Sequence, residues 1–118
     1  MRLLVCGDRN WTDYDLILSA IVDLWPSTVI EGEARGVDSL AASAAHLLGI
    51  AVAPFPANWG LYGRDAGYIR NQQMLDEGKP DMILAFHDDL GHSKGTADMV
   101  WRAEHAGVPV RVISHSYK

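Results

Sequence analysis

The chain has 118 residues, 48% of them hydrophobic, so it can bury one core and is expected to form a single domain over residues 1–118. Its formal net charge of −5 argues against a protein that coats DNA or RNA, since such proteins usually present a basic face. Apolar runs are too short to cross a bilayer, and one cysteine excludes an internal disulfide, so we expect a cytoplasmic protein.

Short apolar segments alternate with amphipathic segments of helical periodicity, which predicts an α/β fold with a parallel sheet covered by helices on both faces. In chain order, the sequence predicts a strand at residues 2–6, a helix from residue 12 or 13 to 24, a strand at 28–30, a helix at 37–48, a strand at 50–55, a helix at 68–77, a strand at 81–86, a helix at 96–106 and a strand at 108–113. The expected architecture is therefore a five-stranded parallel sheet flanked by helices.

Residue types near the boundaries support these limits. Thr12 or Asp13 can cap the first helix, and Pro26 stops it. Residues 57–67 are expected to form a long loop, which in so small a domain is usually functional, and the polar segment 114–118 is expected to fray. Three tryptophans are assigned to packing: Trp11, Trp25 and Trp101.

Basic residues concentrate where a ligand is expected. Ligands of an open parallel sheet bind beyond the carboxyl ends of its strands. The loops after the first four strands lie on that edge. Half of the ten Lys and Arg residues fall in or beside these loops: Arg9, Arg35, Arg64, Arg70 and Lys94. A locally positive pocket in an acidic protein indicates a small anionic ligand rather than a long nucleic acid.

The stretch 31–38, EGEARGVD, reads as a strand end, a tight glycine loop and a helix start. In this arrangement the loop N–H groups and the guanidinium of Arg35 can hold a phosphate. The alternative is an ordinary turn in which Arg35 is solvated and Asp38 caps the helix. Gly95 and Thr96 begin the last predicted helix and offer a second anion site, although Thr96 also suits a plain N-cap.

Aromatic and acidic residues complete the predicted rim. Trp59 and Tyr62 lie in the long loop, where one of them stacks on a base or both anchor the loop to the core. Asp8, Glu31 and Glu33 are acids at the same rim that can act as a general base or hold ribose hydroxyls.

Metal and thiol chemistry are not expected. Cys6 ends a strand and is best explained by packing. His87, Asp88, Asp89 and His92 have side chains that can bind metal, but their spacing fits no specific site. The sequence gives no indication of a cofactor.

Five segments carry a resemblance to a known family: GDR at 7–9, GEARGVDSLA at 32–41, FPANW at 55–59, AGYIRNQQML at 66–75 and GTADMV at 95–100. In order and spacing they resemble the SLOG superfamily of Rossmann-like nucleotide-binding proteins, and within it the YspA-like branch. The resemblance implies a Rossmann-like sheet and a nucleotide or nucleotide-derived ligand. The predicted ligand-binding residues are Gly7, Arg9, Gly32, Arg35, Gly36, Asp38, Trp59, Arg70, Asn71, Lys94, Gly95 and Thr96.

One relative within this resemblance indicates an enzymatic alternative. The LOG enzymes are phosphoribohydrolases that cleave a base from ribose phosphate with an arginine and the glutamate of a Gly-Thr-x-x-Glu motif. The resemblance places that arginine on Arg70 and that glutamate on Met99. Asp98 is the nearest acid, about 100° away around the helix. A phosphoribohydrolase with Arg70 and Asp98 as catalytic residues is therefore the alternative, and the missing glutamate argues against it.

A second relative is the DprA family of DNA-processing proteins, which shares an Ala-Arg-Gly-x-Asp loop. It indicates nucleic-acid processing as a third alternative, which the acidic charge of this chain disfavours. Family members commonly carry a Pro-Gly-Gly loop before Gly-Thr. This chain has residues 87–94 there instead, with Lys94 supplying a positive charge. Apolar helix surface and the habits of related proteins are compatible with a homo-oligomer.

Overall fold

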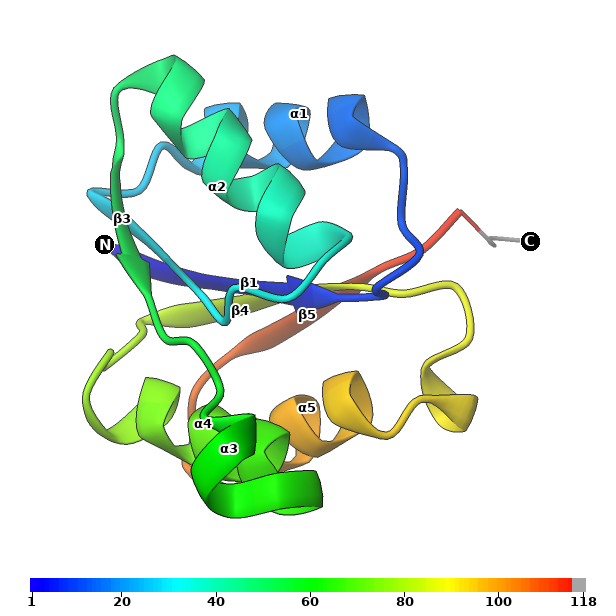
Figure 1. The fold of residues 1–118 in the computed structure, drawn as a ribbon. Coiled ribbons are helices and arrows are strands. Elements are labelled where there is room, and N and C mark those ends of the chain that lie inside the picture. Colours follow the sequence, from blue (N-terminus) through cyan, green and yellow to red (C-terminus); the bar gives the residue numbers. More distant parts are fainter. Residues whose placement is uncertain (116–118) are drawn as a thin grey trace.

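A five-stranded, all-parallel sheet lies at the centre of the computed structural model, which describes residues 1–115 (Figure 1). The strands are β1 (Arg2–Gly7), β2 (Thr28–Glu31), β3 (Ala51–Pro54), β4 (Met82–Phe86) and β5 (Val110–Ile113). Their order in the sheet is β3-β2-β1-β4-β5. This confirms the predicted α/β fold with a five-stranded parallel sheet.

Helices cover both faces of the sheet. The long helices are α1 (Tyr14–Leu24), α2 (Val37–Leu48), α4 (Ala66–Asp76) and α5 (Gly95–His105). The short ones are α3 (Trp59–Tyr62), η1 (Gly63–Asp65) and η2 (Leu90–His92). Figure 1 shows α1 and α2 on one face and α3, α4 and α5 on the other.

Alternation along β1 divides the core into two layers. Leu3 and Val5 pack with α1 and α2, whereas Leu4 and Cys6 pack with α4 and α5. All four side chains are buried, as expected for a central strand with a helix layer on each face. The alanine-rich inner face of α2 is fully buried in the first layer, since its small side chains let the helix approach the sheet closely.

The strand order reverses between β1 and β4, because the chain leaves β1 toward β2 on one side and later returns to β4 on the other. Gly7 at the end of β1 lies beside Phe86 at the end of β4. A Cβ atom at Gly7 would be 2.2 Å from the carbonyl oxygen of Phe86, so a side chain has no room there. The two strand ends therefore bound a crevice of the kind that binds ligands in open α/β sheets.

Several predicted boundaries are wrong by one or two residues, and one predicted loop is partly helical. Residues 57–67 are not a structureless loop, since they contain α3 and η1 and the first turn of α4. Asn58 caps α3 by accepting from the N–H of Leu61 at 3.0 Å, a local interaction that period-based reasoning does not detect. β5 begins at Val110, after Pro109.

Two of the three tryptophans are not packed inside. Trp11 is buried, but Trp25 and Trp101 are more than half exposed, at 56% and 57%. Trp101 instead stacks on His105 of the next helical turn, with ring centroids 3.9 Å apart. The prediction that segment 114–118 frays is wrong for His115, which makes three hydrogen bonds, and residues 116–118 lie outside the described residues.

Within residues 1–115, the helices are too short or too polar for any of them to cross a membrane.

Candidate functional site

A cavity of about 410 Å³ lies at the carboxyl ends of the strands, over the crevice between β1 and β4. Its walls come from the loops after β1, β2 and β4, from α3 and α4, and from the start of α5. Ten of the predicted ligand-binding residues line it: Gly7, Arg9, Arg35, Asp38, Trp59, Arg70, Asn71, Lys94, Gly95 and Thr96. Gly32 and Gly36 are not among the lining residues.

The cavity is cationic around an apolar floor. All five basic residues singled out in the sequence line it, against the carboxylates of Asp8 and Asp38. The floor is formed by Cys6, Met74 and Met99, each at least nine-tenths buried. Burial raises the pKa of the Cys6 thiol, so this cysteine stays protonated and serves in packing.

Gly36 joins the loops after β1 and β2. Its backbone is left-handed, with φ of +75°, and a Cβ atom there would lie 2.3 Å from the carbonyl oxygen of Asp8. The same oxygen accepts a hydrogen bond from the N–H of Val37 at 3.2 Å, at the first residue of α2. Only glycine fits this contact, which brings Arg35 to the loop of Arg9 and Asn10. The guanidinium of Arg35 donates to Asn10 Oδ1 at 3.3 Å.

The predicted phosphate cradle in the Gly32–Asp38 loop is already filled by the protein. Asp38 Oδ2 accepts hydrogen bonds from the N–H groups of Gly32 at 3.1 Å and Ala34 at 3.2 Å. Glu31 Oε1 accepts from the N–H of Glu33 at 2.6 Å. The prediction that these amides hold a phosphate is therefore wrong. The alternative that Asp38 caps α2 is also wrong, because the N-cap position is Gly36.

These two carboxyl groups are held out of water. Burial raises the pKa of Asp38 to about 6 and that of Glu31 to about 7, and the guanidinium of Arg70 opposes both shifts. Burial likewise lowers the pKa of Arg70, with Asp38 opposing that shift. The three groups form a charge cluster in which Asp38 and Arg70 line the cavity and Glu31 lies behind them.

The raised pKa of Glu31 predicts that its contribution to folding weakens with rising pH. The folded state holds this proton longer than the unfolded state, so the free energy of unfolding falls between about pH 4 and pH 7. Glu31→Gln keeps an oxygen that can accept from Glu33 and removes the charge. We expect it to raise the free energy of unfolding by about 1 kcal/mol at pH 8 and to change nothing at pH 4.

Urea unfolding at the two pH values measures this effect. Glu33→Gln is the matched control: Glu33 is exposed and its charge is a lesser cause of the Glu31 shift, so this variant should change stability far less at pH 8 and not at all at pH 4. A Glu31→Gln protein that is less stable than the parent at pH 8 would show that the fold needs the charge.

Arg70 and Asn71 brace the Gly32 loop against the start of α5. Arg70 Nη1 donates to the carbonyl oxygen of Gly32, and its Nε donates to Asn71 Oδ1 at 3.1 Å. Asn71, itself buried, donates from Nδ2 to the carbonyl oxygen of Gly95 at 3.1 Å. The Arg70 guanidinium is thereby fixed in the cavity wall rather than left mobile on the helix surface.

Asp98 does not line the cavity. Its Oδ2 accepts from Asn71 Nδ2 at 3.0 Å and from Arg102 Nε at 2.8 Å, between α4 and α5. Met99, the position that the resemblance aligns with the LOG glutamate, is on the cavity floor. The one-residue offset therefore turns the acid away from the site and places a thioether in it.

The start of α5 presents free helix-terminal amides to the cavity. Gly95 and Thr96 are its first two residues, and N–H groups in a first turn have no intrahelical acceptor. Ser93 supplies a side-chain hydrogen bond at this end of the helix: its Oγ accepts from the N–H of Ala97 at 3.0 Å. Thr96 lies inside the helix, so the alternative that it is the N-cap is wrong.

Trp59 stands at the mouth of the cavity. Its side chain is half exposed and lines the cavity, and the guanidinium of Arg9 lies 5.8 Å from its ring centroid. Tyr62 is also half exposed but does not line the cavity. The alternative that both aromatic residues anchor the loop in the core is therefore wrong.

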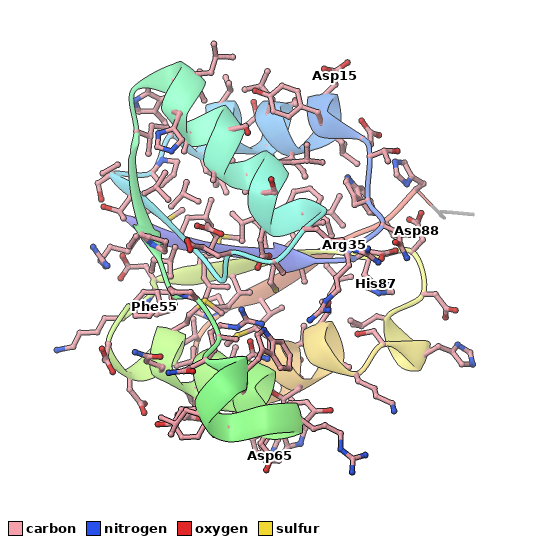
Figure 2. All side chains as sticks on the ribbon, in the orientation of Figure 1. Asp15, Arg35, Phe55, Asp65, His87 and Asp88 are labelled. Atoms are coloured by element: carbon pink, nitrogen blue, oxygen red, sulfur yellow. The ribbon has the colours of Figure 1, made fainter. Side chains whose placement is uncertain are left out.

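Sequence reasoning missed three polar lining residues: Asn10, Tyr68 and Ser93. Each is within two residues of a predicted site residue, which is the signal that could have identified it. His87, considered only for metal binding, also lines the cavity, and Figure 2 shows it with Arg35 beyond the end of β1. Across residues 1–115, no group of three or more His, Cys, Asp or Glu side chains is arranged to hold a metal ion.

The parallel sheet, the helices on both of its faces and the reversal of strand order between β1 and β4 place the protein in the Rossmann-like α/β class. The model of the YspA, cpYpsA-related SLOG family matches residues 1–62. The Gene 61 protein of Mycobacterium phage D29 is 35% identical over 119 residues, covering 92% of this chain and 93% of that protein. The chain belongs to the YspA, cpYpsA-related SLOG family, which confirms the resemblance seen in the sequence.

The fold is also found among solved structures. The X-ray structure of DNA processing protein A (DprA) from Streptococcus pneumoniae superposes with a TM-score of 0.81 at 16% identity. The match covers 98% of this chain and 50% of that one. This chain thus spans half the length of the DprA chain, and at such low identity the likeness concerns the fold alone.

Proposed function

We propose that the protein binds a nucleotide or nucleotide-derived small molecule in the cavity at the carboxyl edge of the sheet. The observation that carries the proposal is the convergence of five cationic side chains on one cavity of an acidic protein. Its volume, about 410 Å³, is within the range of small-molecule sites. Membership of a SLOG family supports a nucleotide-related ligand.

The phosphate binds at the start of α5. The amides of Gly95 and Thr96 and the ammonium of Lys94 form one side of this subsite, and Arg35 and Arg9 face it from the other loops. A helix N-terminus with flanking cations is well suited to an anion. The Gly32–Ala34 amides take no part, because the carboxylates of Glu31 and Asp38 occupy them.

The base and sugar occupy the remainder of the cavity. Trp59 and Tyr68 line it from α3 and α4 and offer aromatic faces for stacking, and the floor around Met74 and Met99 is apolar. Any nucleobase can stack on an aromatic side chain, so these contacts support affinity for nucleotides as a class.

Calorimetric titration with a panel of nucleoside 5′-monophosphates and diphosphates tests the proposal. We expect binding by the parent protein and about tenfold weaker binding by Arg35→Ala, because an exposed charged hydrogen-bond donor is lost. Arg111→Ala is the matched control, since Arg111 is an exposed arginine on β5 outside the cavity. Absence of binding, or equal binding by Arg35→Ala, would contradict the proposal.

The two alternatives give different results in the same experiments. A phosphoribohydrolase would release free base from nucleoside monophosphates, and Asp98→Asn would abolish the release if this acid replaces the LOG glutamate. The contacts of Asp98 with Asn71 and Arg102 favour binding without cleavage. A DprA-like activity would appear as a salt-dependent gel shift with single-stranded DNA.

A further inference from the structure

His115, which follows β5, is hydrogen-bonded to two aspartates from different loops. Its Nε2 lies 2.7 Å from Asp13 Oδ2, and its Nδ1 lies 2.9 Å from Asp88 Oδ2. Its backbone N–H also donates to Asp88 Oδ1 at 2.6 Å. The imidazole stacks on Trp11, with ring centroids 4.5 Å apart and an interplanar angle of 17°. Three contacts thus fix the exposed ring, and a fourth fixes its backbone.

The two aspartates lie in the loops that follow β1 and β4; neither lines the cavity itself. Asp13 ends the loop after β1, whose Arg9 and Asn10 line the cavity. Asp88 follows His87 in the loop after β4, and His87 lines the cavity as well. Because β1 and β4 flank the crevice, a tie between these loops links the two segments that leave it.

Trp11 connects His115 to the loop after β1. It is buried, its N–H donates to the carbonyl oxygen of Asp8 at 3.2 Å, and its Nε1 donates to that of Asp13 at 3.0 Å. Its ring also packs edge-on against Phe86 at the end of β4, with centroids 5.7 Å apart. The ring of His115 therefore rests on the residue that sets the path of the β1 loop.

The tie needs a proton to be complete. A protonated imidazole donates from both nitrogens, whereas a neutral one has a single N–H and gives up its ring hydrogen bond to Asp13 or to Asp88, of which Asp88 alone keeps the backbone N–H of His115. Asp13 and Asp88 are the charged groups that face the ring, and both raise the pKa of His115 above its ordinary value. The same contacts lower the pKa of each aspartate.

We propose that His115 is a positioning residue for the ligand cavity: in its protonated form it holds the β1 loop and the β4 loop together across the crevice. The inference rests on the proposed function, since it assigns His115 a role in the affinity of that same site. Ligand affinity then falls as the pH rises through the titration of His115, when the imidazole gives up one of its two hydrogen bonds to the aspartates.

The test is the pH profile of binding of adenosine 5′-monophosphate between pH 5.5 and 8.5. His115→Gln removes the titrating group. The difference between its profile and that of the parent isolates His115 from the ligand phosphate, Glu31 and Asp38, which titrate in the same range. We expect the parent to bind about threefold more tightly than His115→Gln at pH 6 and equally at pH 8.5. Superimposable profiles would overturn the inference.

His92→Gln is the matched control. His92 also pairs with an aspartate, Asp89, at 2.7 Å, and this contact raises its pKa in the same direction. However, both residues belong to one loop, and neither lines the cavity. This variant should reproduce the parent profile throughout.

A second measurement tests the link between the two loops in the absence of ligand. In the ligand-free protein, NMR titration should give His115 a pKa above its ordinary value that Asp88→Asn lowers, and amide exchange at Asn10 and His87 should accelerate in His115→Gln. If the parent fails to bind the nucleotide while these results hold, the proposed function fails and the tie stands. An ordinary pKa for His115 that is unmoved by Asp88→Asn would overturn the tie itself.

Discussion

Arg70→Ala is expected to weaken nucleotide binding by about 10- to 100-fold, the largest effect on affinity of any single change in the cavity. Arg70 lines the cavity and also donates to the carbonyl oxygen of Gly32 and to Asn71. The substitution therefore removes a positive charge from the proposed site and releases both the Gly32 loop and the start of α5, where Asn71 holds Gly95.

Arg70→Lys distinguishes the two roles. It keeps a positive charge at the cavity but cannot hold the planar fork between Gly32 and Asn71. Calorimetry with the nucleotide panel should place its affinity between those of the parent and Arg70→Ala, and urea unfolding should show a loss of about 2 kcal/mol for the alanine variant. Equal affinities for all three proteins would exclude Arg70 from the site.

Gly36→Ala is expected to lower the free energy of unfolding by about 3 kcal/mol. Alanine at φ of +75° is strained, and its Cβ would lie 2.3 Å from the Asp8 carbonyl oxygen, which is backbone and cannot move aside cheaply. The loops after β1 and β2 must then separate, so the cavity wall that carries Arg35 is lost together with stability.

Gly49 provides the matched control for this substitution. Its φ is +71°, almost the same, but no atom lies within 4 Å of the Cβ that alanine would add. Gly49→Ala should therefore show the backbone strain alone, about 1 kcal/mol in urea unfolding. If the two variants lose equal stability, the close approach of Gly36 to Asp8 does not contribute.

The architecture could be predicted because hydrophobic periodicity reports on it directly. Leu3, Leu4, Val5 and Cys6 form a continuous apolar run, and this is what a strand buried on both faces requires. The order of the strands in the sheet could not be predicted in the same way, since one alternation of strands and helices is compatible with several orders. The short helix α3 was missed because its signal is the local cap by Asn58 rather than a period.

The residues that line the cavity could be predicted from topology, whereas the hydrogen-bond partners of each side chain could not. Glycines and cations in loops at one sheet edge must converge, and ten of the twelve predicted ligand-binding residues line the cavity. That the amides of Gly32 and Ala34 are taken by Asp38 depends on side-chain rotation, which spacing does not determine. Likewise, the direction of Asp98 toward Asn71 and Arg102 follows from the packing of α4 against α5.

The carboxylates of Glu31 and Asp38 have a consequence for how a ligand is captured. Since they already satisfy the amides of the Gly32 loop, that loop holds its shape without any guest. Binding of a ligand then costs little free energy for ordering the Gly32 loop. The conformational entropy lost on binding comes mainly from the exposed cationic side chains of the cavity. The cavity is thus preorganised on the β2 side, whereas the exposed cations Arg9, Arg64 and Lys94 must be ordered when an anion binds.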